Sequence, residues 1–395
     1  MVSGATPAPR MEAQKPDSPA PHQLEDGADS TTRSVTTKET ARPMVRFDSP
    51  SWLLKSLWAR FASIWTKRFV LSLLAGQLVS LCITCTDVTT TELVNRGWVL
   101  PTTQTLFLYF TLFVVYTPYT IYKYGFVGWG KVVFYDGWKY CILATCDVEG
   151  NFLVVKAFQY TDLLSCMLLN SWAIPTCMFF SFFLMRTRYT WTQLAGILIC
   201  ICGLVMLVVS DQLTANGGHE VHDKAKGDLF MVIGATLYGI SNATEEFLVR
   251  KSPLYEVLGQ LGMWGTLIIG TQAAVLEHKA IVNVPWNGPI AGLLLAYTTA
   301  LFIFYTMAPI VYRLASAVFY NLSLLSANFF GLLFGLFLFH YRPFWLYFVA
   351  FPVIIAGLVC YFWSATPESQ GNVDPRSPSY IHQEDDKKDS PAGRG

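Results

Sequence analysis

Long apolar runs occupy most of the sequence between Phe69 and Trp363. A helix that crosses a bilayer needs about 20 mostly apolar residues, so this stretch can hold ten such helices joined by short loops. The expected spans are 69–88, 104–122, 139–159, 163–185, 191–210, 228–248, 255–276, 287–310, 315–338 and 343–363. Only 14% of the residues are charged, whereas a soluble domain carries roughly 25%. The sequence therefore predicts an all-α integral membrane protein with ten transmembrane helices.

Both ends of the chain differ from this apolar centre. Residues 1–50 and 364–395 are rich in proline, serine and charged residues. Such segments cannot bury enough apolar surface to offset the entropy of ordering, so we expect disordered cytoplasmic tails. Residues 51–68 mix apolar and basic side chains, which fits either an amphipathic juxtamembrane helix or an extension of the first span. No apolar run follows Met1, so we expect no cleavable signal peptide.

Lysine and arginine residues are unevenly divided between the two sets of loops. With a cytoplasmic N-terminus, the inner loops hold Lys123, Lys131, Lys139, Arg186, Arg188, Arg250, Lys251 and Arg313. The outer loops hold Arg96, Lys224, Lys226, Lys279 and Arg342. Because basic residues mark cytoplasmic loops, we expect both termini in the cytoplasm. The sequence contains no retrieval signal, so it does not distinguish a plasma-membrane protein from one of the Golgi or endoplasmic reticulum. The net charge of +1 gives no basis for a nucleic-acid partner.

The ten spans divide into two sets of five, 69–210 and 228–363, joined by a loop at 211–227. Because five is odd, the second set must enter the membrane in the opposite orientation, which is the inverted repeat common in transporters. A shared ten-residue spacing supports this division: it separates Gly76 from Thr86-Asp87, and Gly234 from Thr244-Glu245. The sequence thus predicts a 5+5 inverted repeat.

The third expected span carries many polar side chains. They are Asp147, Glu149, Asn151, Lys156, Gln159 and Tyr160. A charge in the middle of a bilayer costs roughly 2.5–3.5 kcal/mol on insertion scales, so it normally faces a cavity or a partner. Glu149 and Lys156 lie on one helical face but two turns apart, and each needs another partner or water. The two interpretations are a solute path and an ion network that holds helices together.

The sixth expected span carries a polar stripe. Its members are Tyr238, Ser241, Asn242 and Glu245, and Glu246 follows directly as a further candidate site residue. Side chains at these spacings share one helical face, which indicates a solute path or binding site, although the two glutamates also lie near the cytoplasmic end of the span. Tyr160 and Trp172 could stack on a planar solute, and Glu149 or Glu245 could carry a coupled proton.

An intramembrane enzyme and a channel are the distant alternatives. Residues 245–250 spell E-E-x-x-x-R, a pattern of CAAX-type membrane proteases, but that chemistry needs histidines from neighbouring spans and none lies deep in a span. The pair Cys82-x-x-Cys85 has no second pair to complete a zinc site, and no filter motif indicates a channel. We expect that the protein is not an enzyme and that it binds no metal ion or cofactor. The pair Gly331-x-x-x-Gly335 predicts close helix packing, with a homodimer as the alternative.

Four segments carry a resemblance to a known family. They are LCITCTDVTT (81–90), CDVEGNFLVVKAFQYT (146–161), LYGISNATEEFLVRK (237–251) and FFGLLFGLFLFHYR (329–342). From Phe69 to Trp363 the chain resembles the F-type branch of solute carrier family 35, in the drug/metabolite transporter superfamily. The resemblance implies a ten-helix carrier that works by alternating access, with one five-helix half rocking against the other around a central cavity.

The charge of the expected cavity limits the kind of solute. Better-known branches of the family exchange nucleotide-sugars for nucleoside monophosphates, which is the alternative function. A nucleotide diphosphate needs several cavity cations, yet Lys156 is the one intramembrane cation in these segments, against Asp147, Glu149, Glu245 and Glu246. We therefore expect a neutral or cationic organic solute, such as a nucleobase-like or amine-bearing metabolite, as the partner besides the lipid bilayer.

Overall fold

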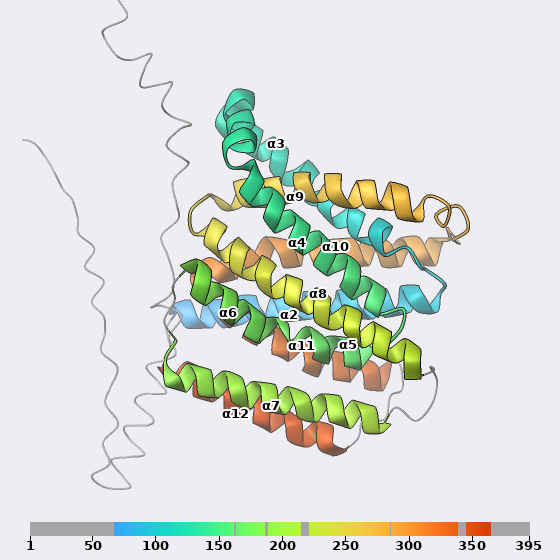
Figure 1. Cartoon of the computed structure of the whole chain (residues 1–395), viewed down its shortest axis with the longest axis vertical. Coiled ribbons are helices and arrows are strands. Elements are labelled where there is room, and N and C mark those ends of the chain that lie inside the picture. The colour runs from blue at the N-terminus through green and yellow to red at the C-terminus, as the bar shows by residue number, and fades with distance from the viewer. Residues whose placement is uncertain are drawn as a thin grey trace, which may run out of the picture.

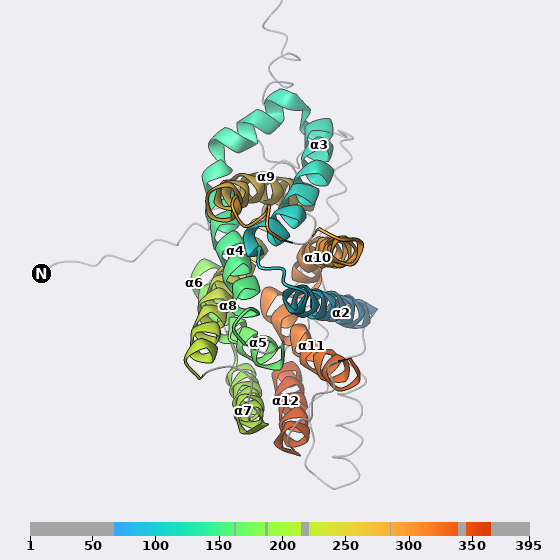
Figure 2. The same ribbon diagram turned by 90° about the vertical axis from the view of Figure 1, so that its right-hand side faces the viewer.

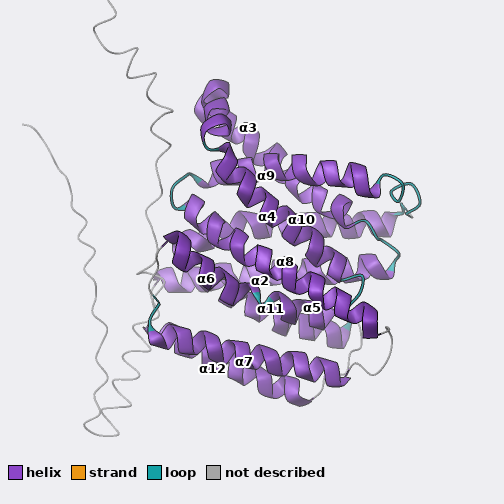
Figure 3. Cartoon of the chain, viewed as in Figure 1, coloured by secondary structure: helices purple, strands orange, loops and turns teal. Residues whose placement is uncertain are grey.

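The computed structural model describes residues 67–364 except 162, 186–188, 215–220, 285 and 339–344. The expected tails and most of the juxtamembrane segment therefore lie outside the described residues. The described part consists of helices and connecting loops, without strands (Figure 3). The helices are α2 (Lys67–Asn95), α3 (Pro101–Tyr135), α4 (Gly137–Ala157), α5 (Leu163–Asn170), α6 (Ala173–Met185), α7 (Trp191–Thr214), α8 (Val221–Val249), α9 (Leu254–Gln272), a π-helical turn η1 (Ala273–Glu277), α10 (Gly288–Leu314), α11 (Ala317–Phe337) and α12 (Trp345–Ser364).

Each expected span coincides with one or two of these helices. By length and composition, α2, α3, α10 and α11 are long and apolar enough to cross a membrane, and α6, α7 and α12 contain shorter apolar stretches. The all-α fold is thus confirmed, whereas ten membrane crossings stay a prediction. Helices α7 and α8 also extend into the expected loop at 211–227, of which residues 215–220 are not described.

The fourth expected span, 163–185, is not one continuous helix. It is divided into α5 and α6 by a turn at Ser171-Trp172. The turn is closed by hydrogen bonds from the Trp172 N–H to the Leu169 carbonyl and from the Ile174 N–H to the Ser171 carbonyl, both 3.0 Å. Pro175 follows in the first turn of α6, where the missing N–H of proline costs nothing. The apolar composition is continuous across this turn, so it gave no signal of a break.

The helices pack in a pattern that joins the first half of the chain to the second. Helix α3 packs along α9 at one end of the molecule, and α7 packs along α12 at the other end (Figures 1 and 2). Between these pairs, α8 packs on α4 and α6, and α2 packs on α10 and α11. This arrangement leaves α2, α4, α8, α10 and α11 around the centre of the molecule.

Glycines allow the closest of these helix contacts. A Cβ atom on Gly262 of α9 would lie 2.4 Å from the backbone nitrogen of Phe113 in α3. A Cβ atom on Gly196 of α7 would lie 2.5 Å from the backbone nitrogen of Tyr361 in α12. Because small residues let helix backbones approach in membranes, these positions explain why both pairs lie side by side along much of their length.

Candidate functional site

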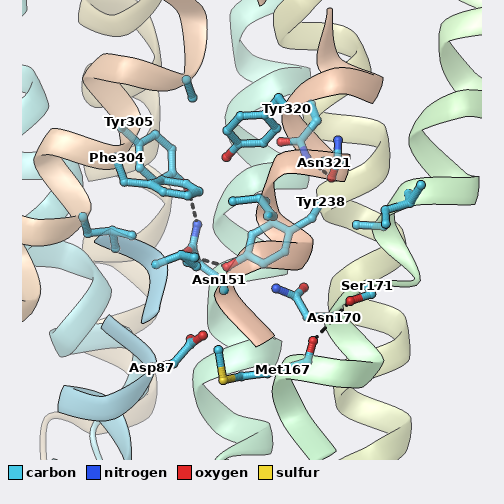
Figure 4. A pocket seen from close by; sticks show the side chains of 18 of the residues that line it. Asp87, Asn151, Met167, Asn170, Ser171, Tyr238, Phe304, Tyr305, Tyr320 and Asn321 are labelled. Carbon is cyan, nitrogen blue, oxygen red and sulfur yellow. Dashed lines mark hydrogen bonds between the residues drawn. The ribbon is translucent and has the colours of Figure 1, made fainter. Parts of the chain in front are cut away.

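A cavity lies at the centre of the bundle, between α2, α4, α5, α6, α8, α10 and α11 (Figure 4). Its walls combine polar and apolar side chains from both halves of the chain, as is usual for small-molecule sites. Its polar lining consists of Asp87, Asp147, Asn151, Asn170, Ser171, Tyr238, Asn242, Glu245, Tyr305, Tyr312, Tyr320, Asn321 and Asn328. The remaining lining residues are apolar, among them Phe304 and Met167.

Asp147 is the centre of a hydrogen-bond network. Its Oδ2 atom accepts from the hydroxyl of Tyr109 at 2.8 Å and from the hydroxyl of Tyr305 at 2.7 Å. Its Oδ1 atom accepts from the hydroxyl of Ser241 at 2.9 Å. Three donors from α3, α8 and α10 thus surround one buried carboxylate, which satisfies the general requirement that a buried charge be hydrogen-bonded. The network fixes Asp147 in place.

Asn151, one helical turn after Asp147, extends the same network. Its Nδ2 atom donates to the Tyr109 hydroxyl at 2.8 Å and to the Tyr305 hydroxyl at 2.7 Å, and its Oδ1 atom accepts from the Tyr238 hydroxyl at 2.9 Å. Figure 4 shows the side chain of Tyr238 reaching across the cavity to Asn151. The polar residues of the third and sixth expected spans therefore meet at one place.

Glu245 is buried in the cavity wall without a complete set of partners. Its side chain is 4% exposed, and its Oε1 atom has no hydrogen-bond partner. Tyr312 lies beside it and donates to Asn242 at 3.2 Å. Asn242 in turn donates to Asn321 of α11 at 3.2 Å. A buried carboxylate oxygen that lacks a donor is costly, so this atom is a point where a ligand can bind.

Asp87 is a second carboxylate of this kind. Its side chain is 9% exposed, and no donor within the described part of the chain bonds to its carboxylate. Asn170, at the end of α5, also faces the cavity with a buried Oδ1 atom that lacks a partner. The unsatisfied atoms of the cavity wall are therefore acceptors, and a ligand that fits them supplies donors.

The cavity is acidic. Asp87, Asp147 and Glu245 line it, and none of the described lining residues is lysine, arginine or histidine. Among the described residues, no cluster of three or more histidine, cysteine, aspartate and glutamate side chains could hold a metal ion. The arrangement can therefore bind a neutral or positively charged molecule through hydrogen bonds and aromatic contacts.

Five of the twelve site residues expected from the sequence line the cavity: Asp147, Asn151, Tyr238, Asn242 and Glu245. Ser241 reaches the cavity network through its bond to Asp147. The other six lie outside the lining. Glu149 accepts a hydrogen bond from Gln272 of α9. Glu246 pairs with Arg250 at 2.5 Å and accepts from the Ala317 N–H at 3.0 Å.

The four remaining expected residues lie near the end of α4 or on the outer surface. The Lys156 ammonium lies 5.1 Å from the ring centre of Phe152 and 5.4 Å from that of Phe230. Tyr160 packs edge-on against Phe230, and Gln159 is partly buried beside it. Trp172 is about half exposed. None of the four is placed to contact a solute inside the cavity as it stands.

Sequence reasoning did not select several residues of the cavity. Tyr305, Tyr312, Tyr320, Asn321, Asn170, Asn328 and Asp87 line it. Tyrosine and asparagine are common in apolar helices, so single residues of these types gave no signal. The internal repeat did contain a signal for some of them. Equivalent positions of the two halves are 158 residues apart, as Gly76 and Gly234 are, and this offset pairs Asp87 with Glu245 and Asn170 with Asn328.

Comparisons with known proteins identify relatives of this chain. Residues 65–363 match the family model described as Solute carrier family 35. A solute carrier family 35 member of Schizosaccharomyces pombe is 42% identical over 305 residues, which cover 77% of this chain and 60% of that relative. Solute carrier family 35 member F2 of Mus musculus is 37% identical, over 72% of this chain and 76% of the relative. Solute carrier family 35 member F2 of Xenopus tropicalis is 35% identical, over 80% of this chain and 82% of the relative.

A solved crystal structure supports the fold independently. It superposes with a TM-score of 0.54 and covers 74% of this chain and 99% of the solved chain, at 18% sequence identity. At that identity the likeness concerns the fold alone.

Proposed function

The chain belongs to the F-type branch of solute carrier family 35, and from this we propose that it carries a small organic solute, neutral or cationic, across a membrane. The proposed solute class includes nucleobase-like and amine-bearing metabolites. The observation that carries the proposal is the acidic central cavity, which three carboxylates line and no described cation enters.

The same cavity argues against a nucleotide-sugar as the solute. A diphosphate group would be placed against Asp87, Asp147 and Glu245, and unpaired charges in a buried site are strongly unfavourable. Lys156, which would have to bind the phosphates, is held between two aromatic rings outside the lining. Tyr305, Tyr312, Tyr320 and Phe304 instead offer aromatic faces to a planar or cationic molecule.

We propose ten membrane crossings arranged as a 5+5 inverted repeat with both termini cytoplasmic. The helix pairing supports the repeat, because exchanging the two halves maps the main contacts onto one another. The contact of α4 with α8 corresponds to that of α10 with α2, and the contact of α6 with α8 corresponds to that of α11 with α2. The pairs α3 with α9 and α7 with α12 map onto themselves.

The packing also favours a particular form of alternating access. The first helix of each half, α2 or α8, packs on the other half rather than on its own. We therefore propose that the rocking bodies are α2 with α10 and α11, and α8 with α4 and α6, instead of the two five-helix halves of the sequence. The cavity lies between these two bodies, where inverted-repeat carriers bind their solutes.

Uptake into proteoliposomes tests the proposal. The panel contains nucleobases, nucleosides, organic cations and nucleotide-sugars, and wild type is compared with Glu245→Gln and with Glu92→Gln. We expect saturable uptake of one neutral or cationic class. It falls roughly tenfold or more in Glu245→Gln, because a hydrogen bond to a charged group contributes about 1.5–3 kcal/mol. Glu92 is a surface residue paired with Arg96, so its variant retains uptake. Uptake of a nucleotide-sugar would overturn the proposed solute class.

A further inference from the structure

The cavity lining contains pairs of residues that stand 158 positions apart. Asp87 pairs with Glu245, Asp147 with Tyr305, and Asn170 with Asn328. All six line the cavity, and the members of each pair come from opposite halves of the chain. Gly76 and Gly234 stand at the same separation, which extends the correspondence along α2 and α8. The repeat therefore places equivalent polar positions in one binding site.

The members of the carboxylate pair share a chemical property that Asp147 lacks. Asp147 accepts three hydroxyl hydrogen bonds, so its charge is satisfied within the protein. Asp87 and Glu245 are at least nine-tenths buried. Glu245 Oε1 has no partner, and the Asp87 carboxylate receives no hydrogen bond from the described residues. Two buried carboxyl groups thus remain available to a ligand.

The two carboxylates lie toward opposite ends of the cavity. Helices α2 and α8 run in opposite directions (Figure 1), and each carboxylate lies in the C-terminal third of its helix. Figure 4 shows Asp87 at one end of the site and Tyr320 and Asn321 at the other. Glu245 belongs to that second end, because it lies next to Tyr312, whose ring centre is 4.9 Å from that of Tyr320.

We propose that Asp87 and Glu245 are two separate subsites for an organic cation, one at each end of the cavity. The inference rests on the proposed carrier function and specifies the solute as a molecule with a protonated amine or a similar N–H cation. Each subsite receives the cation from its own side of the membrane, so the inverted repeat supplies both faces with the same recognition chemistry.

The surroundings of each carboxylate favour an organic cation over a metal ion. Tyr312 lies beside Glu245, and Tyr238 and Tyr320 line the same cavity as the two carboxyl groups. Aromatic faces attract an ammonium group, whereas hard metal ions need six or more oxygen ligands or several waters. A single carboxylate beside tyrosines matches an ammonium, which donates a few N–H bonds and packs its apolar part against the rings.

Calorimetric titration of the purified full chain with benzylammonium chloride tests the two subsites. Benzyl alcohol is the neutral probe of the same shape, and sodium chloride is the inorganic probe. We expect wild type to bind two benzylammonium ions. Asp87→Asn and Glu245→Gln each bind one, the double variant binds none, and Glu92→Gln binds two. Each lost subsite weakens at least tenfold, since the charge-assisted hydrogen bond is removed.

Three results would overturn the proposal. The first is a single site in wild type, or the loss of all binding in one single variant. The second is equal binding of benzyl alcohol, which would show that apolar contact alone is measured. The third is displacement of benzylammonium by sodium at equal concentration. Melting temperature and size-exclusion profile verify folding, and Asp87→Ser and Glu245→Ala replace a variant that fails to fold.

The outcomes also separate this inference from the carrier function. If the chain binds two benzylammonium ions but transports no member of the uptake panel, the proposal of two subsites is supported and the proposed carrier function is contradicted. If the chain transports a member of the panel but binds one benzylammonium ion or none, the carrier function is supported and the proposal of two subsites is contradicted.

Discussion

Two adjacent acidic residues of α8, Glu245 and Glu246, differ in the contacts that their carboxyl groups make within the protein. Glu245 faces the cavity with a carboxylate oxygen that has no partner. Glu246 faces away from the cavity, pairs with Arg250 at 2.5 Å and accepts the N–H of Ala317 at the start of α11. The second contact also places a negative charge at a helix N-terminus, which is favourable. Glu246 therefore makes a stabilising contact, and a ligand contact is what we propose for Glu245.

We predict that glutamine substitutions separate these roles. Glu246→Gln should lower the free energy of unfolding by about 1.5–3 kcal/mol, because it removes the charge that Arg250 and the Ala317 N–H need. Glu245→Gln should leave stability almost unchanged, because the amide keeps the size of the side chain and the Oε1 atom has no hydrogen bond to lose. Thermal unfolding of the purified variants measures both effects. A lower melting temperature for Glu245→Gln than for Glu246→Gln would contradict the assignment.

At the residue level, sequence reasoning located the charged and amide groups of α4 and α8 but not their partners. Asp147, Asn151 and Glu245 stand out because polar side chains are rare in apolar helices. Tyr109 and Tyr305 do not, because a tyrosine in a membrane helix is ordinary and its hydroxyl gains meaning only from what it touches. Those contacts join residues 38 and 158 positions apart, which no local pattern can reveal.

At the level of elements, the contact between α9 and α3 depends on a side chain being absent. Gly262 lies where a Cβ atom would be 2.4 Å from the Phe113 nitrogen and 2.8 Å from the Leu112 carbonyl carbon. Both atoms belong to the backbone of α3 and cannot turn aside. The helices would have to separate, although a single methyl group is added.

We predict that Gly262→Ala destabilises the protein by about 1–3 kcal/mol, the usual cost of overpacking. The matched control is Gly292→Ala in α10, where a Cβ atom would meet nothing within 4 Å. There the substitution should stabilise slightly, because alanine is the better helix former by roughly 1 kcal/mol. Thermal unfolding of the two variants distinguishes them, and equal effects would show that α3 and α9 have room for a methyl group between them.

The elements themselves follow from the sequence more readily than their interruptions do. Apolar runs of suitable length predicted the helices, since a chain in lipid must satisfy its backbone hydrogen bonds internally. The turn between α5 and α6 depends on two residues within an otherwise apolar stretch. Gly125, with φ of 70°, lies beyond the second expected span, in a segment through which α3 continues to Tyr135. Composition averages over such positions, and the structure had to reveal them.

For the whole molecule, the positions of basic residues predict which loops face the cytoplasm. A Gly/Ser-rich segment that carries one Asn-X-Thr sequon should be glycosylated when it is inserted after Asn283, in the loop between η1 and α10. The same segment appended after Gly395 should remain unmodified, because the C-terminus is expected in the cytoplasm. A gel-mobility shift that a glycosidase reverses measures the modification. Glycosylation of the C-terminal segment alone would invert the proposed topology.

The helix packing predicts how the two halves of the chain depend on each other. In the described part, α2 packs on α10 and α11, α8 packs on α4 and α6, and the outer pairs α3–α9 and α7–α12 also join the halves. Each half alone would expose the faces that these contacts bury. The halves should therefore be unable to form a stable carrier separately but should assemble when both are present.

A break between residues 214 and 221 tests this dependence. We expect the two fragments, co-expressed in one cell, to co-purify and to restore saturable uptake, because the break lies between α7 and α8 and removes no helix contact. Either fragment expressed alone should be degraded, since its unpaired polar groups, such as Asp147 without Tyr305, would face lipid. If each fragment alone were stable and monomeric, the rocking bodies would be the sequence halves, and the exchange of α2 and α8 between them would play no part in transport.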